Sequence, residues 1–183
     1  SYEVGDVVDK EVTPRDFGRI AAQAAKQVVT QRVREAERGV IYNDFIDRVD
    51  DIMTGKIQRK DQRFLYVHLG KLEGKLPFNE VMPNESYDIH DRIKVYVTRV
   101  ENTGKGPQVF VSRTHPGLLK RLFEMEVPEI YEGIVEIRSV AREAGDRSKI
   151  SVYAEEPEVD PVGACVGQRG QRVQTIVDEL RGE

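Results

Sequence analysis

The sequence predicts a multidomain α+β protein in which a long helix is followed by a small β-barrel and then by a compact domain of helices and strands. Three patterns predict this class. Apolar residues recur at helical spacing before residue 50, short runs alternate with period two between residues 51 and 114, and helix and strand signals follow one another from residue 115. The predicted parts are therefore residues 1–50, 51–114 and 115–183.

The composition suits a protein with two small folded domains. The chain has 183 residues, of which 39% are hydrophobic and 33% are charged. No apolar run reaches the roughly 20 residues that cross a membrane, and residues 1–16 lack the pattern of a signal peptide. We therefore expect a cytoplasmic protein that makes no membrane contact. The single cysteine, Cys165, cannot form an internal disulfide or a cysteine-rich zinc site, and its apolar neighbours predict a small buried side chain.

Charge is distributed unevenly along the chain, whose net charge is −4. Residues 51–114 are basic, with 11 Lys and Arg against 8 Asp and Glu, whereas residues 115–183 are acidic, with 9 against 14. No acid occurs between Pro161 and Val177. Binding of an anionic partner would thus depend on local positive surface and not on the field of the whole protein.

The first element is a helix of about 25 residues. Thr13 to Asp16 reads as its start, with a Thr cap, a Pro in the first turn and an acid at the capping-box position. Gly39 is the expected end. Since Ser1 to Val12 is too short to form a domain, we expect a fragment whose connector helix belongs to a larger N-terminal domain. A partner-binding helix is the alternative. The apolar face consists of Phe17, Ile20, Ala21, Ala24, Val28 and Val33.

Residues 51–114 predict a small closed barrel of the OB type. Alternation is strict at residues 63–69, and the runs at residues 93–100 and 108–112 also place aliphatic residues on one face. Their aliphatic faces form the expected core: Leu65, Val67, Leu69, Ile93, Val95, Val97, Val109 and Val111. The expected turns lie at Gly70, Gly74, Pro77, Pro83, Gly104 and Gly106.

The opposite faces of these strands carry aromatic rings beside positive charge, a mixture that suits stacking on unpaired bases. An equally open alternative for each ring is packing under a loop or against a neighbouring domain. The candidate residues are Phe64, Tyr66, His68, Lys94, Tyr96 and Phe110. No cluster of Cys, His or carboxylates supports a metal site at His68.

The last part alternates helix and strand. Leu118, Leu119, Leu122 and Phe123 mark a helix that breaks near Pro128. Strand-like runs follow at residues 133–141 and 149–154, joined by a turn at Gly145 and Asp146. Two further helical segments flank a glycine loop. This is the order of a type II KH domain, which would be truncated here before its last strand.

The most informative segment is the Gly-x-x-Gly turn between these two helical segments. Asp160 can cap the first helix, and Pro161 suits its first turn. Gly167 and Gly170 would let a partner approach the backbone closely, and the helix after Gly170 directs free N–H groups and a positive dipole end at that partner. A KH domain uses this arrangement to clamp roughly four nucleotides by the backbone.

The loop residues expected to hold phosphates are Gly167, Gln168, Arg169, Gly170 and Arg172. A groove beside the loop would accept bases, lined by Val162, Val166, Val173, Ile150 and Val152.

Several longer strings resemble the NusA family of bacterial transcription factors, and together they extend over nearly the whole chain: residues 17–28, 126–133, 140–143, 160–173 and 179–183. The resemblance implies the end of a polymerase-binding N-terminal domain, an S1 barrel and a first KH domain. The S1 barrel departs from the common pattern, because residues 64–68 read Phe-Leu-Tyr-Val-His where many S1 domains have a Phe-Gly-Ala-Phe-type strand.

The same resemblance implies a monomeric, non-catalytic factor that binds RNA polymerase near the RNA exit channel and contacts single-stranded nascent RNA. Such factors promote pausing and hairpin-dependent termination, and they join other antitermination factors. Most of the polymerase-binding domain and a second KH domain would be absent from this piece.

Two other functions compete with this interpretation. The RNA-binding tail of an exoribonuclease usually runs KH then S1, the reverse of this chain. A ribosomal or assembly protein is usually strongly basic, and this sequence has a pI of about 5.6. No carboxylate pair or Cys/His set is placed for catalysis, so we expect no enzyme activity, no metal and no cofactor. Glu155, Glu156 and Glu158 lie in a Pro-containing stretch that predicts a solvated loop.

Overall fold

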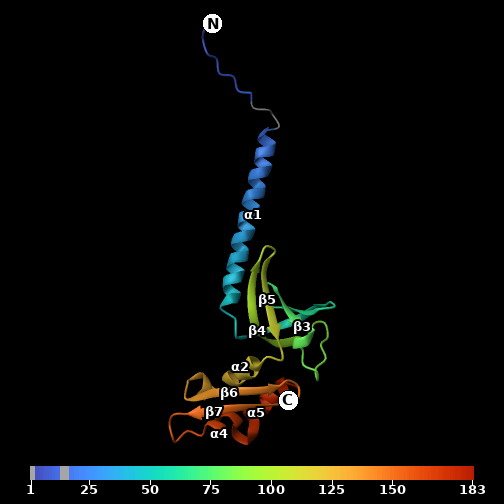
Figure 1. The fold of residues 1–183 in the computed structure, drawn as a ribbon, viewed down its shortest axis with the longest axis vertical. Helices are drawn as coiled ribbons and strands as arrows, with labels where there is room; N and C mark the ends of the chain where they lie inside the picture. The colour runs from blue at the N-terminus through green and yellow to red at the C-terminus, as the bar shows by residue number, and fades with distance from the viewer. Residues whose placement is uncertain (1–2, 13–16) are drawn as a thin grey trace. The chain divides into compact units, whose positions relative to one another are not determined.

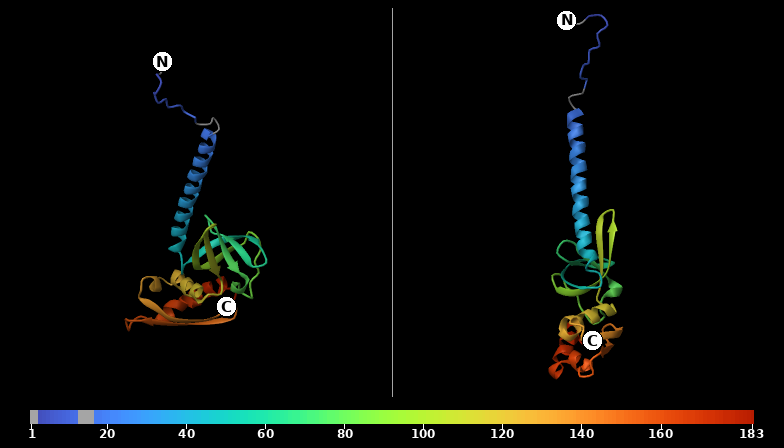
Figure 2. Two further views of the ribbon diagram at one scale, coloured as in Figure 1. Left: turned by 45° about the horizontal axis from the view of Figure 1, so that its top comes forward. Right: turned by 90° about the vertical axis from the view of Figure 1, so that its left-hand side faces the viewer.

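The computed structural model describes residues 3–12 and 17–183. It forms two compact units, residues 1–39 and residues 40–183. The long helix α1 is coloured blue to cyan, the barrel green, and the C-terminal helices and strands yellow to red (Figure 1, Figure 2). The predicted fold class is confirmed: a long helix, a five-stranded barrel and a KH-like α+β region follow in that order.

Helix α1 (Phe17–Ile46) continues past its predicted end. Gly39 lies inside the helix, and the predicted start at residues 13–16 lies outside the described residues. A glycine inside a helix costs about 1 kcal/mol, which the following turns offset by packing. Phe45 is 4% exposed in the barrel core, and Ile41 and Tyr42 pack against the same core. The last turns of α1 therefore belong to the compact unit of the barrel.

The barrel is closed by five strands in the order β1-β2-β3-β5-β4, with β4 paired back to β1. The β3–β5 pair is parallel and the other four pairs are antiparallel. Gly74, an expected turn, instead lies within β3, where a Cβ atom would come within 2.8 Å of Leu69 Cδ1. The strands are β1 (Ile52–Lys60), β2 (Phe64–His68), β3 (Glu73–Pro77), β4 (Arg92–Thr103) and β5 (Gly106–Ser112), with a 3-10 turn, η1 (Phe78–Glu80), after β3.

The predicted core face of the barrel is confirmed. Each aliphatic residue assigned to the interior is buried, and Ile57 and Leu76 complete the cluster. Because side chains alternate along a strand, this assignment also fixes the residues that point outward from the barrel.

The C-terminal region has its own core and a separate two-stranded antiparallel sheet. The predicted helix face is confirmed, since all four of its apolar residues are buried with Ile176 and Leu180. Cys165 is buried in the same core, and burial raises the pKa of its thiol. The elements are α2 (Pro116–Glu126), α3 (Pro128–Tyr131), β6 (Val135–Glu143), β7 (Arg147–Ala154), α4 (Pro161–Val166), η2 (Gln168–Gly170) and α5 (Gln171–Glu179).

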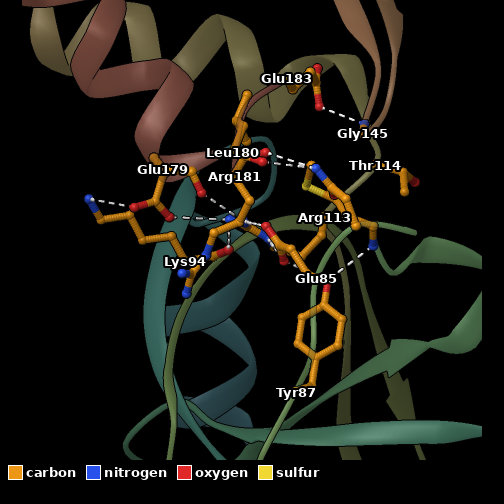
Figure 3. A network of polar contacts seen from close by, with 12 residues as sticks. Glu85, Tyr87, Lys94, Arg113, Thr114, Gly145, Glu179, Leu180, Arg181 and Glu183 are labelled. Atoms are coloured by element: carbon orange, nitrogen blue, oxygen red, sulfur yellow. Dashed lines mark hydrogen bonds and ion pairs between the residues drawn. The ribbon is translucent and has the colours of Figure 1, made fainter.

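A buried polar network joins the barrel to this region (Figure 3). Arg113, directly after β5, is 3% exposed and pairs with Glu85 of the β3–β4 connection. Its guanidinium also donates to the backbone oxygens of Lys94, at 2.9 Å, and of Glu179, at 3.1 Å. One buried cation therefore bonds to both domains.

Candidate nucleic-acid interface

The glycine loop has the local structure that the sequence predicts. The Gly163 N–H donates to Asp160 Oδ1 at 3.0 Å, which caps α4, and Pro161 occupies its first turn. Gly167 and Gly170 both have positive φ, at 76° and 72°, and Arg169 between them has a φ of 54°. Three residues of positive φ within four positions form the turn between α4 and α5.

The two glycines have different surroundings. A Cβ atom at Gly170 would meet only Val173 Cγ1, at 4.0 Å, so the backbone there faces open space. A Cβ atom at Gly167 would lie 2.7 Å from Arg172 Cγ. Gly170 thus fits the predicted close approach of a partner, whereas Gly167 is also required by packing within the loop.

Arg169 is the exposed cation of the loop. Among the described residues it has no hydrogen bond or ion pair, and Gln168 beside it is exposed as well. Gly170 caps α5 without a side-chain hydrogen bond, so the first N–H groups of that helix lie next to Arg169. The Gln171 N–H already donates to the Gln168 carbonyl. The Arg169 guanidinium, unpaired within the described residues, beside the positive end of α5 is therefore the feature that suits an anionic group such as a phosphate.

Arg172 requires a correction, because the structure does not leave it free for a phosphate. Its Nη1 donates to Glu129 Oε2 at 2.8 Å and to the Ala164 carbonyl at 2.7 Å. Its aliphatic stem packs against Gly167. Arg172 therefore bridges α3, α4 and the loop, a geometry that favours a positioning role over the predicted phosphate contact.

The groove residues divide into two groups. Ile150, Val152 and Val173 are half-buried and pack against the C-terminal core, so each offers only part of its surface to the predicted groove. Val162 and Val166 on α4 are 60% and 38% exposed. The apolar surface beside the loop is therefore supplied mainly by α4, because one face of β7 is used for packing.

A second candidate surface lies on the outside of the barrel. One row of cross-strand neighbours passes through all five strands and alternates cation with aromatic: Arg59, Tyr66, Lys75, Phe110 and Arg99. We call it the aromatic–basic row. Phe64 lies beside it, with ring centroids 6.0 Å from Tyr66 and 6.4 Å from Phe110. Rings flanked by cations can stack on bases while the cations attract the phosphates.

The rings in this row differ in accessibility. Phe64 and Phe110 are half-buried, whereas Tyr66 is only 8% exposed and is not the open ring that the sequence predicts. The Arg59 guanidinium lies 3.6 Å from the Tyr66 ring centroid, and the Tyr66 hydroxyl donates to Asp61 Oδ2 at 2.6 Å. That bond and two backbone N–H groups lower the pKa of Asp61 to about 2, so this acceptor is ionised at neutral pH.

Tyr96 and Lys94 lie away from this row. Tyr96 is 5% exposed and packs in the C-terminal core, where its ring stacks on His115 at 4.6 Å. Its hydroxyl donates to Asp50 Oδ1 at 2.8 Å, and burial together with this bond raises the pKa of Tyr96 to about 12. Lys94 approaches Glu179 at 3.9 Å. The alternative of packing against the neighbouring domain is therefore the correct one for Tyr96.

Sequence reasoning missed the three cations of the row. Arg59, Lys75 and Arg99 come from three strands, and each is in line with a ring only through the strand register. β-bulges in β1 and β4 shift that register next to Arg59 and Arg99. The basic balance of residues 51–114 was the only signal in the sequence, and it does not say which cations meet which rings.

The remaining candidates are His68 and the three acids before α4. His68 is exposed at the end of β2. Among residues 3–12 and 17–183 no group of three or more His, Cys, Asp or Glu could hold a metal ion. Glu155, Glu156 and Glu158 are exposed in the β7–α4 loop, as predicted. No helix in the described part of the chain is long and apolar enough to span a bilayer.

A closed barrel with an outer row of rings and cations, followed by a KH-type glycine loop, defines an RNA-binding protein of the S1–KH class. Family comparisons agree: a model of the NusA N-terminal domain matches residues 1–39, the S1 RNA binding domain matches residues 46–112, and the NusA-like first KH domain matches residues 113–183. The chain belongs to the NusA family.

Curated relatives match this chain in sequence over nearly its whole length. The chain is 75% identical to the transcription termination/antitermination protein NusA of Halalkalibacterium halodurans over 183 residues, and 75% identical to that of Bacillus subtilis over 182. It is 46% identical to the protein of Thermus thermophilus over 182 residues. These alignments cover 100%, 100% and 99% of this chain and 48%, 49% and 47% of the relatives. The chain thus spans about half the length of the curated relatives it matches.

Proposed function

We propose that this chain is the RNA-contacting part of a transcription factor that binds single-stranded nascent RNA and RNA polymerase. Through these contacts it modulates elongation, pausing, termination and antitermination. The observation that carries the proposal is the glycine loop, in which Arg169, unpaired in the described part of the chain, and the open backbone at Gly170 lie at the start of α5. These groups suit the phosphates of a strand whose bases lie against the α4 surface.

The aromatic–basic row supports a second RNA contact in the same unit. Phe64 and Phe110 offer partly exposed rings, and Lys75 lies 5.4 Å from one ring centroid and 5.9 Å from the other. Stacking on such rings is worth about 1–3 kcal/mol per base and tolerates any base. We infer that the barrel binds with little sequence preference, while the loop fixes the path of the backbone.

Contact with RNA polymerase is proposed for residues 1–39, which match the NusA N-terminal domain. Other antitermination factors are proposed as further partners, since the curated relatives are termination/antitermination proteins. We place the protein in the cytoplasm as a monomer and assign it no catalytic step.

The experiment is fluorescence anisotropy with a labelled single-stranded RNA at several salt concentrations. The test variant is Arg169→Gln, which removes one charge at nearly constant shape. Arg181→Gln is the matched control, because Arg181 is also an exposed arginine with a left-handed φ, of 57°, in a different loop. Gly167→Asp is avoided, since the added side chain would displace Arg172.

We expect Arg169→Gln to weaken binding several-fold and to reduce the slope of log K against log[salt] by about 1. Arg181→Gln should leave both quantities unchanged. Equal losses in the two variants would mean that diffuse positive charge, and not the loop, binds RNA. No salt-dependent binding by the unmodified chain would contradict the proposed function itself.

A further inference from the structure

An open cleft beside α2 and α3 has no part in the proposed RNA contacts. Its volume is about 700 Å³, and residues 47–51, which follow α1, form the opposite wall. We call it the α3 cleft. Its lining residues are Asp47, Val49, Asp51, Arg121, Glu124, Met125, Pro128 and Tyr131.

Large apolar side chains stand exposed at this cleft. Tyr131 is 84% exposed and Met125 is 64% exposed, although Tyr131 directly follows Ile130, a buried residue of the C-terminal core. Pro128 and Val49 extend the apolar surface between them. Single exposed hydrophobic residues are ordinary, but several around one concavity mark an interaction site. Tyrosine and methionine are moreover enriched where proteins meet proteins.

The charge around this apolar surface is negative. Arg121, the one base in the lining, is engaged, since its Nη1 donates to Glu124 Oε2 at 2.7 Å and its Nε donates to the Asp50 carbonyl at 2.6 Å. Asp47 has no ion-pair partner among the described residues. The same holds, within the described part of the chain, for Glu126 and Glu132, which are adjacent in sequence to Met125 and Tyr131.

This charge pattern selects the kind of partner. A phosphate backbone would be repelled by the carboxylates, so the α3 cleft is unsuited to RNA. Complementarity requires lysine or arginine on the partner, and the exposed Tyr131 and Met125 require an apolar side chain between those bases. We propose that the α3 cleft docks a basic protein segment that carries an apolar anchor residue.

The position of the cleft gives such docking a route to the glycine loop. α3 contributes Pro128 and Tyr131 to the lining of the cleft. Glu129, on the same helix, accepts the hydrogen bond from Arg172. A partner seated on α3 therefore contacts the helix that positions the loop.

The probe is a short synthetic peptide in which Leu and Phe are flanked by lysines. Binding is followed by the amide signals of the ¹⁵N-labelled chain in NMR titrations. A second peptide replaces Leu and Phe by Gly and keeps every lysine. The protein variants are Tyr131→Ser and Asp47→Asn, and Tyr153→Ser is the matched control, because Tyr153 is an exposed tyrosine of β7 outside the α3 cleft lining.

We expect saturable shifts at residues 47–51 and 124–131, weakened about tenfold by Tyr131→Ser and by the glycine peptide, and less by Asp47→Asn. Tyr153→Ser should bind like the unmodified chain, and RNA affinity should be equal in all three variants. The proposal is overturned if the glycine peptide binds as well as its parent, if Tyr131→Ser binds normally, or if no saturable shifts occur in the cleft. Circular dichroism of each variant confirms that the fold is retained.

Discussion

The Glu129–Arg172 pair allows a test of what Arg172 does. Its two possible roles predict opposite changes in RNA affinity when Glu129 is replaced. If Arg172 positions the loop, Glu129→Ala releases its guanidinium from α3 and weakens RNA binding. If Arg172 instead serves as a phosphate ligand that Glu129 holds back, the same substitution frees a cation and strengthens binding. The 2.8 Å bond to Glu129 and the 2.7 Å bond to the Ala164 carbonyl favour the first role.

The magnitude follows from the exposure of the pair. A hydrogen bond to a charged group contributes about 1.5–3 kcal/mol when buried, whereas an exposed ion pair contributes about 0–1 kcal/mol. The Arg172 and Glu129 side chains are 30% and 33% exposed, between these limits. We therefore expect a loss of about 1 kcal/mol, or roughly fivefold in RNA affinity.

Anisotropy titrations with single-stranded RNA would measure this loss. Removing any negative charge near the RNA raises RNA affinity slightly by itself. Glu132→Ala is therefore the control, because Glu132 is an exposed acid only three residues after Glu129. Arg172→Ala should lose at least as much as Glu129→Ala, because it also removes the bond to the Ala164 carbonyl. The double variant should lose no more than Arg172→Ala alone, and the salt slope should not change. Tighter binding by Glu129→Ala than by Glu132→Ala, or a slope reduced by about 1 in Arg172→Ala, would refute the positioning role.

Three further predictions concern stability and are measured by urea unfolding. Arg113→Ala should cost about 3–5 kcal/mol, because it leaves the buried Glu85 carboxylate without its cation. Arg59→Ala removes an exposed pair with Glu73 and should cost below about 1 kcal/mol. Similar costs in the two variants would contradict the argument from burial. Gly117→Ala should destabilise the chain by about 1–3 kcal/mol, since the new Cβ would lie 2.5 Å from Tyr96 Cζ, and a neutral result would mean that the ring shifts freely. The pKa of Asp61 is about 2 in the folded chain, below its unfolded value of about 3.9. Its contribution to stability is therefore present above about pH 4 and is lost as the pH falls towards 2. Asp61→Asn should remove that part of the pH dependence of stability, and an unchanged pH profile would argue against the Tyr66 bond.

The sequence by itself determined the inner faces of three barrel strands and of α2, and the glycine turn between α4 and α5, but it did not reveal β1 or β3. Strict alternation assigned Leu65, Val67 and Leu69 to the barrel core, because a strand places successive side chains on opposite sides. Asp160, Pro161 and the two loop glycines gave the α4–loop–α5 turn, because capping and positive φ are properties of a few neighbouring residues. These features depend on local chemistry, which a linear sequence contains in full.

Only the tertiary structure decided which surface residues are available. Tyr96 and Phe110 occupy similar outward positions on their strands, yet one is stacked on His115 in the C-terminal core and the other remains in the aromatic–basic row. Arg169 and Arg172 are three residues apart, yet among residues 3–12 and 17–183 only Arg172 meets a carboxylate, contributed by Glu129 from 43 residues away in the sequence. α1 runs through Gly39 because distant barrel residues pack on its last turns. In each case the deciding neighbour is brought close by the fold, and no local pattern in the sequence specifies it.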